Sequence, residues 1–191
     1  MRARTTMNMK SGGTLYGHLT VTVYDVKNGQ RKRLLRISKK NQITNGGREV
    51  VLALLAQDPG GAYPVQVNPE YGQIWSLAIG TGSAPPDIGD LSLYSEVVPP
   101  GGRLVLTIPA EREYVITPGS VYEIQIHKEL PPHTLTGTFL AEAGLYTRGD
   151  NDDPSLSADQ VLYARQIHPV FEKGEFMAVE YDWRLGMLVQ A

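Results

Sequence analysis

The sequence predicts a mainly β protein, an antiparallel β-sandwich of the jelly-roll-like kind with one short helix and an extended N-terminal arm. Runs of alternating apolar and polar residues recur along the chain, and Gly, Pro, Asn and Asp clusters separate them at spacings of roughly ten residues. Only one segment shows helical periodicity. The 191 residues can bury a substantial core, so we expect a single domain over residues 14–191.

The N-terminal part predicts an arm followed by a hairpin. Residues 1–13 are small, polar and without a period that would bury a face, so we expect a flexible arm. The text LYGHLTVTVYDV then alternates like a half-buried strand, and RKRLLRISKK returns as a second strand. Between them, Asn28-Gly29 predicts a type I′ turn because both residues accept a positive φ. We therefore expect a basic hairpin over residues 14–40.

The segment 41–58 is the helix candidate. Thr44, Asn45 or Gly46 can cap its start, valines and leucines follow at helical spacing, and an Asp-Pro-Gly sequence ends it. After a loop over residues 59–72, the text QIWSLAIG predicts a strand buried on both faces. Six further short β-rich runs bring the expected total to about nine strands.

The charge distribution is asymmetric. The net charge is −2, yet residues 1–40 hold ten of the eighteen Lys and Arg residues and only one acid, Asp25. Solvated surface charge, nucleic-acid affinity, contact with an acidic protein surface and head-to-tail attraction between copies are all compatible with this polarity. We favour a protein interface over nucleic acid, because Tyr16 and Tyr24 on the hairpin suit packing under a neighbouring subunit. The interface candidates are Arg2, Arg4, Lys10, Arg31, Lys32 and Arg33.

Composition and spacing predict no catalytic residue, no cofactor and no metal site. Cysteine is absent, the four histidines lack metal-ligand spacing, and there is no G-x-S-x-G nucleophile motif. Glu96 and Glu142 could form a catalytic carboxylate pair only if their separation allowed it. The acidic loop RGDNDDPSLSAD lacks the glycine and glutamate of an EF-hand. No apolar run is long enough to span a membrane and no signal-peptide core is present, so we expect neither a membrane partner nor export by that route.

The stretch AIGTGSAPPDIGDLSLYSE could either cradle a phosphate or turn the chain. Gly80-Thr81-Gly82 begins like a dinucleotide-binding fingerprint, but Pro85 stands where a third glycine at a helix start is needed. Two aspartates follow and add negative charge. We therefore predict that these glycines turn the chain.

Four segments together resemble a group of tailed-bacteriophage virion structural proteins. They are NQITNGGREVVLALLA, WSLAIGTGSAPPDIGDLSLYSE, GTFLAEAGLYT and VLYARQIHPVFEKGEFMAVEYDWRL, within residues 41–185. The matching positions are Gly80, Gly82, Asp90, Leu93, Glu96, Glu142, Gly144, Leu145, Tyr146, Arg165, Pro169, Lys173 and Trp183.

We expect these positions to be architectural. Arg165 is a candidate partner for Glu96 or Glu142, and a partly buried pair of this kind would specify one packing. Asp90 could cap the chain as it enters a strand. The residues assigned structural or assembly roles are Gly80, Gly82, Asp90, Glu96, Glu142, Gly144, Arg165 and Trp183.

The resemblance implies a non-enzymatic component of a phage particle, assembled in the host cytoplasm. The chain length, arm and basic hairpin favour a capsid decoration or cement protein that associates as a trimer or dimer and binds other virion proteins, such as the major capsid protein. A tail or baseplate component is an alternative. A virion-surface glycan-binding module using Trp75, Trp183 and the tyrosines as stacking platforms is another, and a hydrolase acting on the host envelope is the enzyme alternative.

Overall fold

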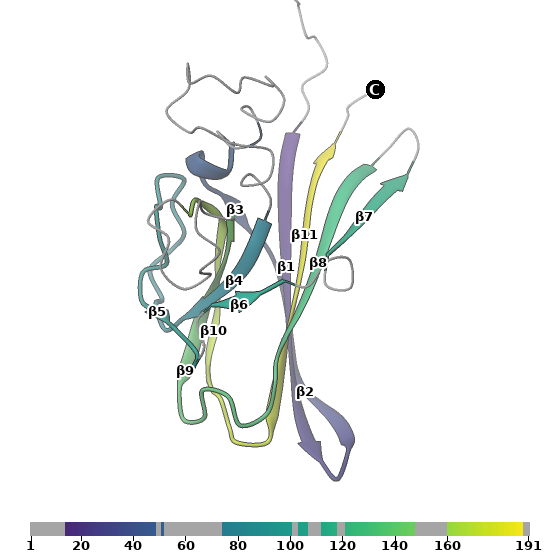
Figure 1. Cartoon of the computed structure of the whole chain (residues 1–191), viewed down its shortest axis with the longest axis vertical. Coiled ribbons are helices and arrows are strands. Elements are labelled where there is room, and N and C mark those ends of the chain that lie inside the picture. Colours follow the sequence, from purple (N-terminus) through teal and green to yellow (C-terminus); the bar gives the residue numbers. More distant parts are fainter. Residues whose placement is uncertain are drawn as a thin grey trace, which may run out of the picture.

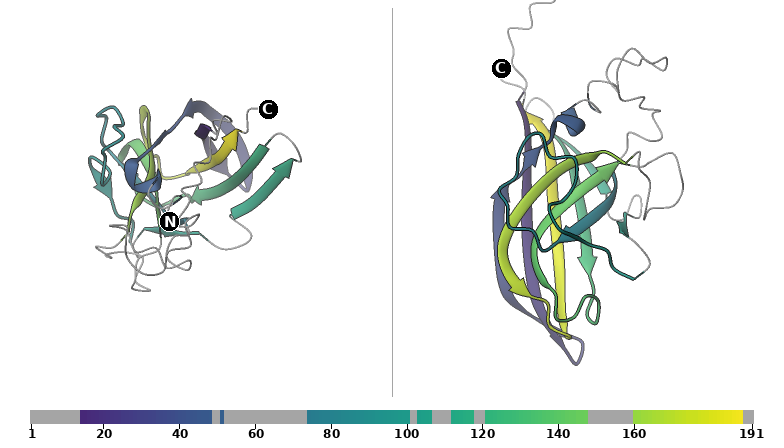
Figure 2. Two further views of the ribbon diagram at one scale, coloured as in Figure 1. Left: turned by 90° about the horizontal axis from the view of Figure 1, so that it is seen from above. Right: turned by 90° about the vertical axis from the view of Figure 1, so that its left-hand side faces the viewer.

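Two antiparallel sheets pack face to face, which confirms the mainly β sandwich (Figures 1 and 2). The computed structural model describes residues 14–48, 51, 74–100, 103–106, 112–117, 121–147 and 160–188. The predicted arm, the end of the helix segment, the loop over residues 59–72 and the acidic loop lie outside the described residues.

The first sheet has five strands in the order β2-β1-β11-β8-β7. Their bounds are β1 Thr14–Lys27, β2 Gln30–Lys40, β7 Arg112–Thr117, β8 Val121–Leu130 and β11 Met177–Leu188. The second sheet has the order β3-β10-β9-β4-β5, and β6 also pairs with β4. Its strands are β3 Gln42–Ile43, β4 Ile74–Gly80, β5 Glu96–Val97, β6 Leu104–Val105, β9 Phe139–Thr147 and β10 Leu162–Glu172.

Four connections join the two sheets among the described strands. Each links two strands that are consecutive along the chain but lie in different sheets: β2 and β3, β6 and β7, β8 and β9, and β10 and β11. Such crossings are typical of double-sheet, jelly-roll-like sandwiches. They place strands that are distant in sequence next to one another, such as β1 and β11 in the first sheet and β4 and β9 in the second.

The predicted basic hairpin forms with the predicted turn. Asn28 and Gly29 have φ angles of 51° and 76°, as a type I′ turn requires. Val23 pairs with Leu35 and Tyr24 with Arg33, so the intervening residue of β2 is the extra residue of a bulge. The hairpin reaches past the body of the sandwich at the bottom of Figure 1.

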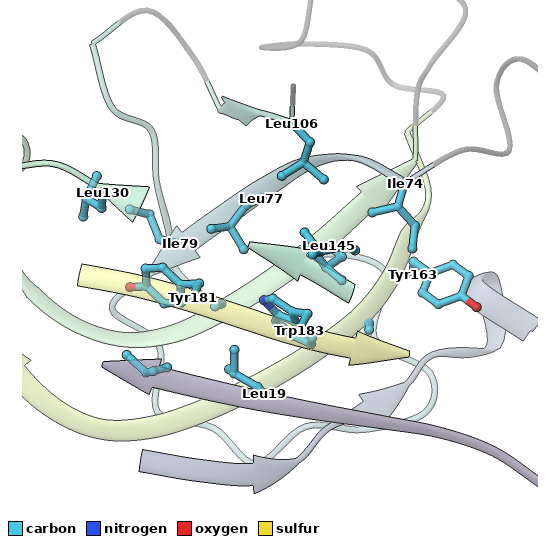
Figure 3. Close-up of a cluster of buried hydrophobic side chains, with 14 of the residues drawn as sticks. Leu19, Ile74, Leu77, Ile79, Leu106, Leu130, Leu145, Tyr163, Tyr181 and Trp183 are labelled. Carbon is cyan, nitrogen blue, oxygen red and sulfur yellow. The ribbon is translucent and has the colours of Figure 1, made fainter. Parts of the chain in front are cut away.

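One apolar core fills the space between the sheets. Trp183 and Tyr181 from β11 are completely buried and face Leu77 and Leu145 from the second sheet (Figure 3). Full burial of a leucine side chain such as Leu77 or Leu145 stabilises the fold by about 1.5–3 kcal/mol relative to exposure. The alternating residues of β1 that the sequence assigns to the core are indeed buried: Leu19, Val21 and Val23.

The second sheet is also covered on its outer face. A smaller cluster forms there from Ala78, Leu93, Tyr146 and Leu162, where a loop over residues 81–95 lies across the strands. Strand β4 is therefore buried on both faces, as predicted for QIWSLAIG.

The helix begins where the sequence predicts it. Residues 45–48 are helical, and the side chain of Thr44 accepts a hydrogen bond from Gly47 N at 3.1 Å. Thr44 is therefore the N-cap among the three candidates. Within the described ranges, no helix is both long and apolar enough to cross a membrane.

Candidate functional site

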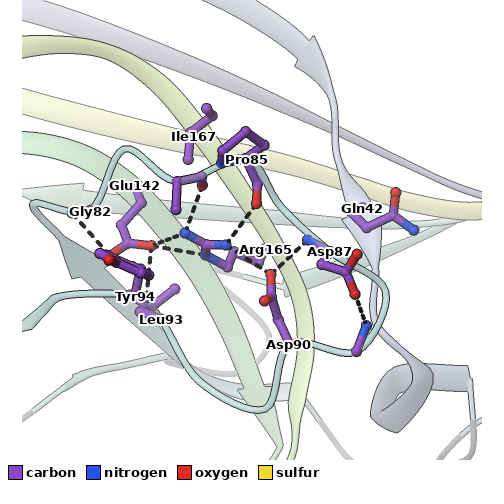
Figure 4. Close-up of polar contacts among 12 residues, drawn as sticks. Gln42, Gly82, Pro85, Asp87, Asp90, Leu93, Tyr94, Glu142, Arg165 and Ile167 are labelled. Carbon is purple, nitrogen blue, oxygen red and sulfur yellow. Dashed lines mark hydrogen bonds and ion pairs between the residues drawn. The ribbon is translucent and has the colours of Figure 1, made fainter.

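Loop 81–95, which joins β4 to β5, is held down by two buried charged residues (Figure 4). Glu142 on β9 is 0% exposed and Arg165 on the neighbouring strand β10 is 1% exposed. Both side chains lie on the outer face of the second sheet, under the loop. A charge buried this deeply needs partners for all of its polar atoms.

The carboxylate of Glu142 accepts its hydrogen bonds from the loop backbone and from Arg165. Oε1 accepts from Gly82 N at 3.1 Å and from Ser95 N at 2.7 Å. Oε2 accepts from Tyr94 N at 3.1 Å and from Arg165 Nε at 2.9 Å. The two ends of the loop are therefore drawn to one buried carboxylate.

The glycines make room for this carboxylate. A Cβ atom on Gly80 would lie 2.6 Å from Glu142 Oε1, and one on Gly82 would lie 2.4 Å from the same oxygen. The GTG stretch thus turns the chain, as predicted, and also lets its backbone approach a buried anion closely. The amide of Gly82, a donor that a phosphate would need, is occupied by Glu142.

All three guanidinium nitrogens of Arg165 also donate hydrogen bonds, and Nε donates to Glu142 as described above. Nη1 donates to Asp90 Oδ2 at 2.8 Å, Nη2 donates to the carbonyl of Ala84 at 3.0 Å, and Nη2 lies 2.8 Å from Glu142 Oε2. Burial acts to lower the pKa of Arg165, but hydrogen bonds to Asp90 and Glu142 and their charges outweigh it and raise that pKa. Of the two partners left open by the sequence, Glu142 is the one that Arg165 binds.

Asp90 closes a turn inside the loop. Its Oδ2 accepts from Asp87 N at 2.8 Å, and its own backbone N donates to the carbonyl of Asp87 at 3.2 Å. The Asp87 side chain in turn accepts from Gly89 N at 2.7 Å. Asp90 therefore caps this turn and links it to Arg165, instead of capping the chain that enters β5 as the sequence suggested.

Glu96 belongs to a second, separate pair. Its carboxylate accepts two hydrogen bonds from Arg103, at 2.5 and 2.7 Å, and that guanidinium lies 3.8 Å from the centre of the Tyr146 ring. The Tyr146 hydroxyl accepts from Leu93 N at 3.1 Å, which ties the end of the loop to β9. Each member of the suggested Glu96 and Glu142 carboxylate pair is thus engaged by a different set of donors. No local sequence signal points to Arg103, which is the one charged residue in a Gly- and Pro-rich connection over residues 97–110.

The two remaining architectural residues, Gly144 and Trp183, are not members of the ion network. A Cβ on Gly144 would lie 2.8 Å from Leu93 Cδ2, so this glycine allows the loop to pack on β9. Trp183 is 0% exposed in the main core, so it cannot stack on a bound sugar. This burial corrects the glycan-platform interpretation of Trp183; Trp75 is half-buried.

The three interface candidates on the hairpin, Arg31, Lys32 and Arg33, differ in their surroundings. Arg31 contacts Glu129 at 2.8 Å and Glu180 at 2.9 Å, so it is neutralised within its own sheet. Lys32 and Arg33 are exposed. The other interface candidates, Arg2, Arg4 and Lys10, lie outside the described residues.

The hairpin tyrosines also have partners in their own sheet. Tyr16 donates to Glu123 Oε2 at 2.8 Å, and its burial together with this carboxylate raises the pKa of Tyr16 to about 12. Burial and a hydrogen bond to Glu180 raise the pKa of Tyr24.

In the part of the chain that the structure describes, no group of three or more His, Asp or Glu side chains is placed to hold a metal ion.

No protein-family model, curated protein or solved structure matches the chain significantly.

Proposed function

We propose that this protein is a non-enzymatic structural protein of a tailed-phage virion, acting as a homo-oligomeric capsid decoration or cement protein. The observation that carries the proposal is the saturation of the buried charges. Glu142 and Arg165 bind each other and the backbone of loop 81–95, so the network fixes a surface instead of presenting a reactive group.

The fixed loop displays apolar side chains to solvent. Leu91 is 85% exposed and Tyr94 is 74% exposed, although the backbone beneath them is anchored. An irregular loop held rigidly in this way binds a protein partner without a further loss of backbone entropy. Tyrosine is also among the residues that contribute most to protein interfaces.

The virion location rests on the resemblance of the sequence motifs. Five of the matching positions, far apart in the chain, meet in one network: Gly80, Gly82, Asp90, Glu142 and Arg165. Their meeting supports the interpretation of the motifs as one architectural unit. We infer that the partners are further copies of the chain and other virion proteins.

Mixing the purified protein with phage particles that lack it tests this function. Electron microscopy should show added density at regular intervals over the capsid. Density confined to the neck, tube or baseplate would move the protein to the tail, and the absence of binding would contradict a virion role.

A variant without residues 1–13 should bind particles more weakly but unfold at the same temperature, and unchanged binding would contradict a role for the arm.

A further inference from the structure

We propose that copies of this protein bind one another head to tail, with loop 81–95 of one copy docking on strand β2 of the next. The inference deepens the proposed function, and it rests on that function only to explain what the contact is for. Its physical basis lies in two complementary patches of the same chain, one on each sheet.

The first patch is acidic and apolar. Loop 81–95 contains no Lys or Arg and has two acids, of which Asp87 is exposed and Asp90 is paired with Arg165. Its large apolar side chains, Leu91 and Tyr94, point into solvent, and Val98, just beyond the loop, is 51% exposed. Large apolar side chains grouped on one exposed segment mark a binding surface more often than isolated ones do.

The second patch is basic and also carries an apolar side chain. Strand β2 contains six Lys or Arg residues and no acid, and Leu34 at its bulge is 47% exposed. Arg31 is neutralised within its own sheet. The remaining five cations are exposed and have no ion pair with any carboxylate among the described residues: Lys32, Arg33, Arg36, Lys39 and Lys40.

Within one copy, no ion pair joins the two patches among the described residues. Strand β2 is an edge of the first sheet (Figure 1), whereas the loop extends from β4 towards the end of β3, where the carbonyl of Ile88 accepts from Asn45 N at 2.7 Å. The loop lies on the outer face of that second sheet. A contact between two different patches is heterologous, and it forms a ring where the rotation closes.

The character of β2 indicates how the loop docks. Its lysines, arginines and bulge are features that prevent edge-to-edge strand pairing, so the contact uses side chains and not an extended sheet. Opposite charges orient the approach, while Leu91 and Tyr94 against Leu34 bury apolar surface. Because Glu142 and Arg165 already order the loop, association costs little additional conformational entropy.

Sedimentation equilibrium over a concentration series is the first test. The wild-type protein should self-associate, and more weakly at high salt because ions screen the charges. Leu91→Ser/Tyr94→Ser in the loop and Arg33→Glu/Arg36→Glu in the strand should each weaken association at least about tenfold. Phe139→Ser/Val170→Ser is the matched control, because these residues are each 57% exposed on β9 and β10, outside both patches, and it should associate like wild type.

Mixing the two interface variants distinguishes head-to-tail contact from symmetric contact. The loop variant keeps an intact strand and the strand variant keeps an intact loop, so a 1:1 mixture should form a heterodimer although each variant alone is monomeric. A mixture that stays monomeric would overturn the proposal, as would a wild-type protein that is monomeric at on the order of 100 µM. Particle binding is measured separately: a monomer that still binds particles overturns this contact alone, whereas head-to-tail association without particle binding contradicts only the virion role.

Discussion

The carboxylate of Glu142 and the guanidinium of Arg165 form a buried ion pair, with Arg165 Nε 2.9 Å and Nη2 2.8 Å from Glu142 Oε2. Removing two charges from water is costly, and their attraction offsets that cost only when every remaining polar atom is bonded. Here the loop backbone supplies those bonds to Glu142. The pair therefore specifies one loop conformation more than it adds to the stability of the fold.

Replacing Arg165 with Met should destabilise the protein by about 3–5 kcal/mol, because it leaves Glu142 buried without a countercharge. Urea unfolding measures the change. Arg31→Met is the matched control: its side chain is 43% exposed and pairs with Glu129 and Glu180, so its loss should cost about 0–1 kcal/mol. Equal effects of the two substitutions would contradict the structural importance of the buried pair.

Replacing Gly82 with Ala should destabilise the protein by about 1–3 kcal/mol, because the new Cβ overlaps the Glu142 carboxylate and forces it to move. The nearest atom would be only 2.4 Å away. Gly89→Ala in the same loop is the control, since its Cβ would meet only Asp87 Oδ1 at 3.2 Å. Thermal unfolding of the two variants should therefore differ clearly, and a Gly82→Ala protein as stable as Gly89→Ala would show that the carboxylate can shift freely.

Hydrogen exchange should reveal the fixed loop directly. The amides of Gly82 and Ser95 lie outside regular strands but donate to a buried carboxylate, so we expect slow exchange in the wild-type protein. Arg165→Met should accelerate both. The amide of Gly89 donates to the exposed side chain of Asp87 and should exchange rapidly in both proteins. Fast exchange at Gly82 in the wild-type protein would contradict a rigid loop.

Local patterns in the sequence predicted the local parts of this fold well. Asn28 and Gly29 fix a turn whose geometry depends on those two residues alone. The helix start at Thr44 likewise follows from one side chain and the next turn of backbone. Two strands of two residues each, β3 and β5, were missed, because they are too short to show a period and exist only through pairing with distant strands.

The ion network could be predicted only in part. The sequence singled out Arg165, Glu142 and Asp90, but it left Glu96 open as the partner of Arg165 because long-range pairing sets which carboxylate lies within reach. Register places Arg165 opposite Gly144, two residues from Glu142 on the same face of the sheet. The carbonyl of Ala84 carries no side-chain signal at all, although it accepts from Arg165 at 3.0 Å.

Acid should destabilise the protein partly through His168. This side chain is buried, Nδ1 lies 3.0 Å from the carbonyl of Pro169, and Nε2 has no hydrogen-bond partner among the described residues. Burial lowers the pKa of His168; the Pro169 carbonyl and the charge of Glu142 oppose this lowering, and the charge of Lys39 reinforces it. As pH falls below about 6.5, the unfolded chain binds a proton that the folded chain does not, so the free energy of unfolding decreases until pH reaches the folded-state pKa.

Two histidine substitutions isolate this contribution to acid stability. His168→Gln removes the buried titrating group, so its free energy of unfolding should decrease less between pH 7.5 and 5.5 than that of the wild-type protein. His133→Gln removes an exposed histidine and should retain the wild-type loss. Urea unfolding at the two pH values gives both differences. If His168→Gln loses as much stability as His133→Gln does, proton uptake on unfolding must occur at other groups, and the apolar surroundings of His168, which include Phe171 stacked at 5.3 Å, would have no role in acid stability.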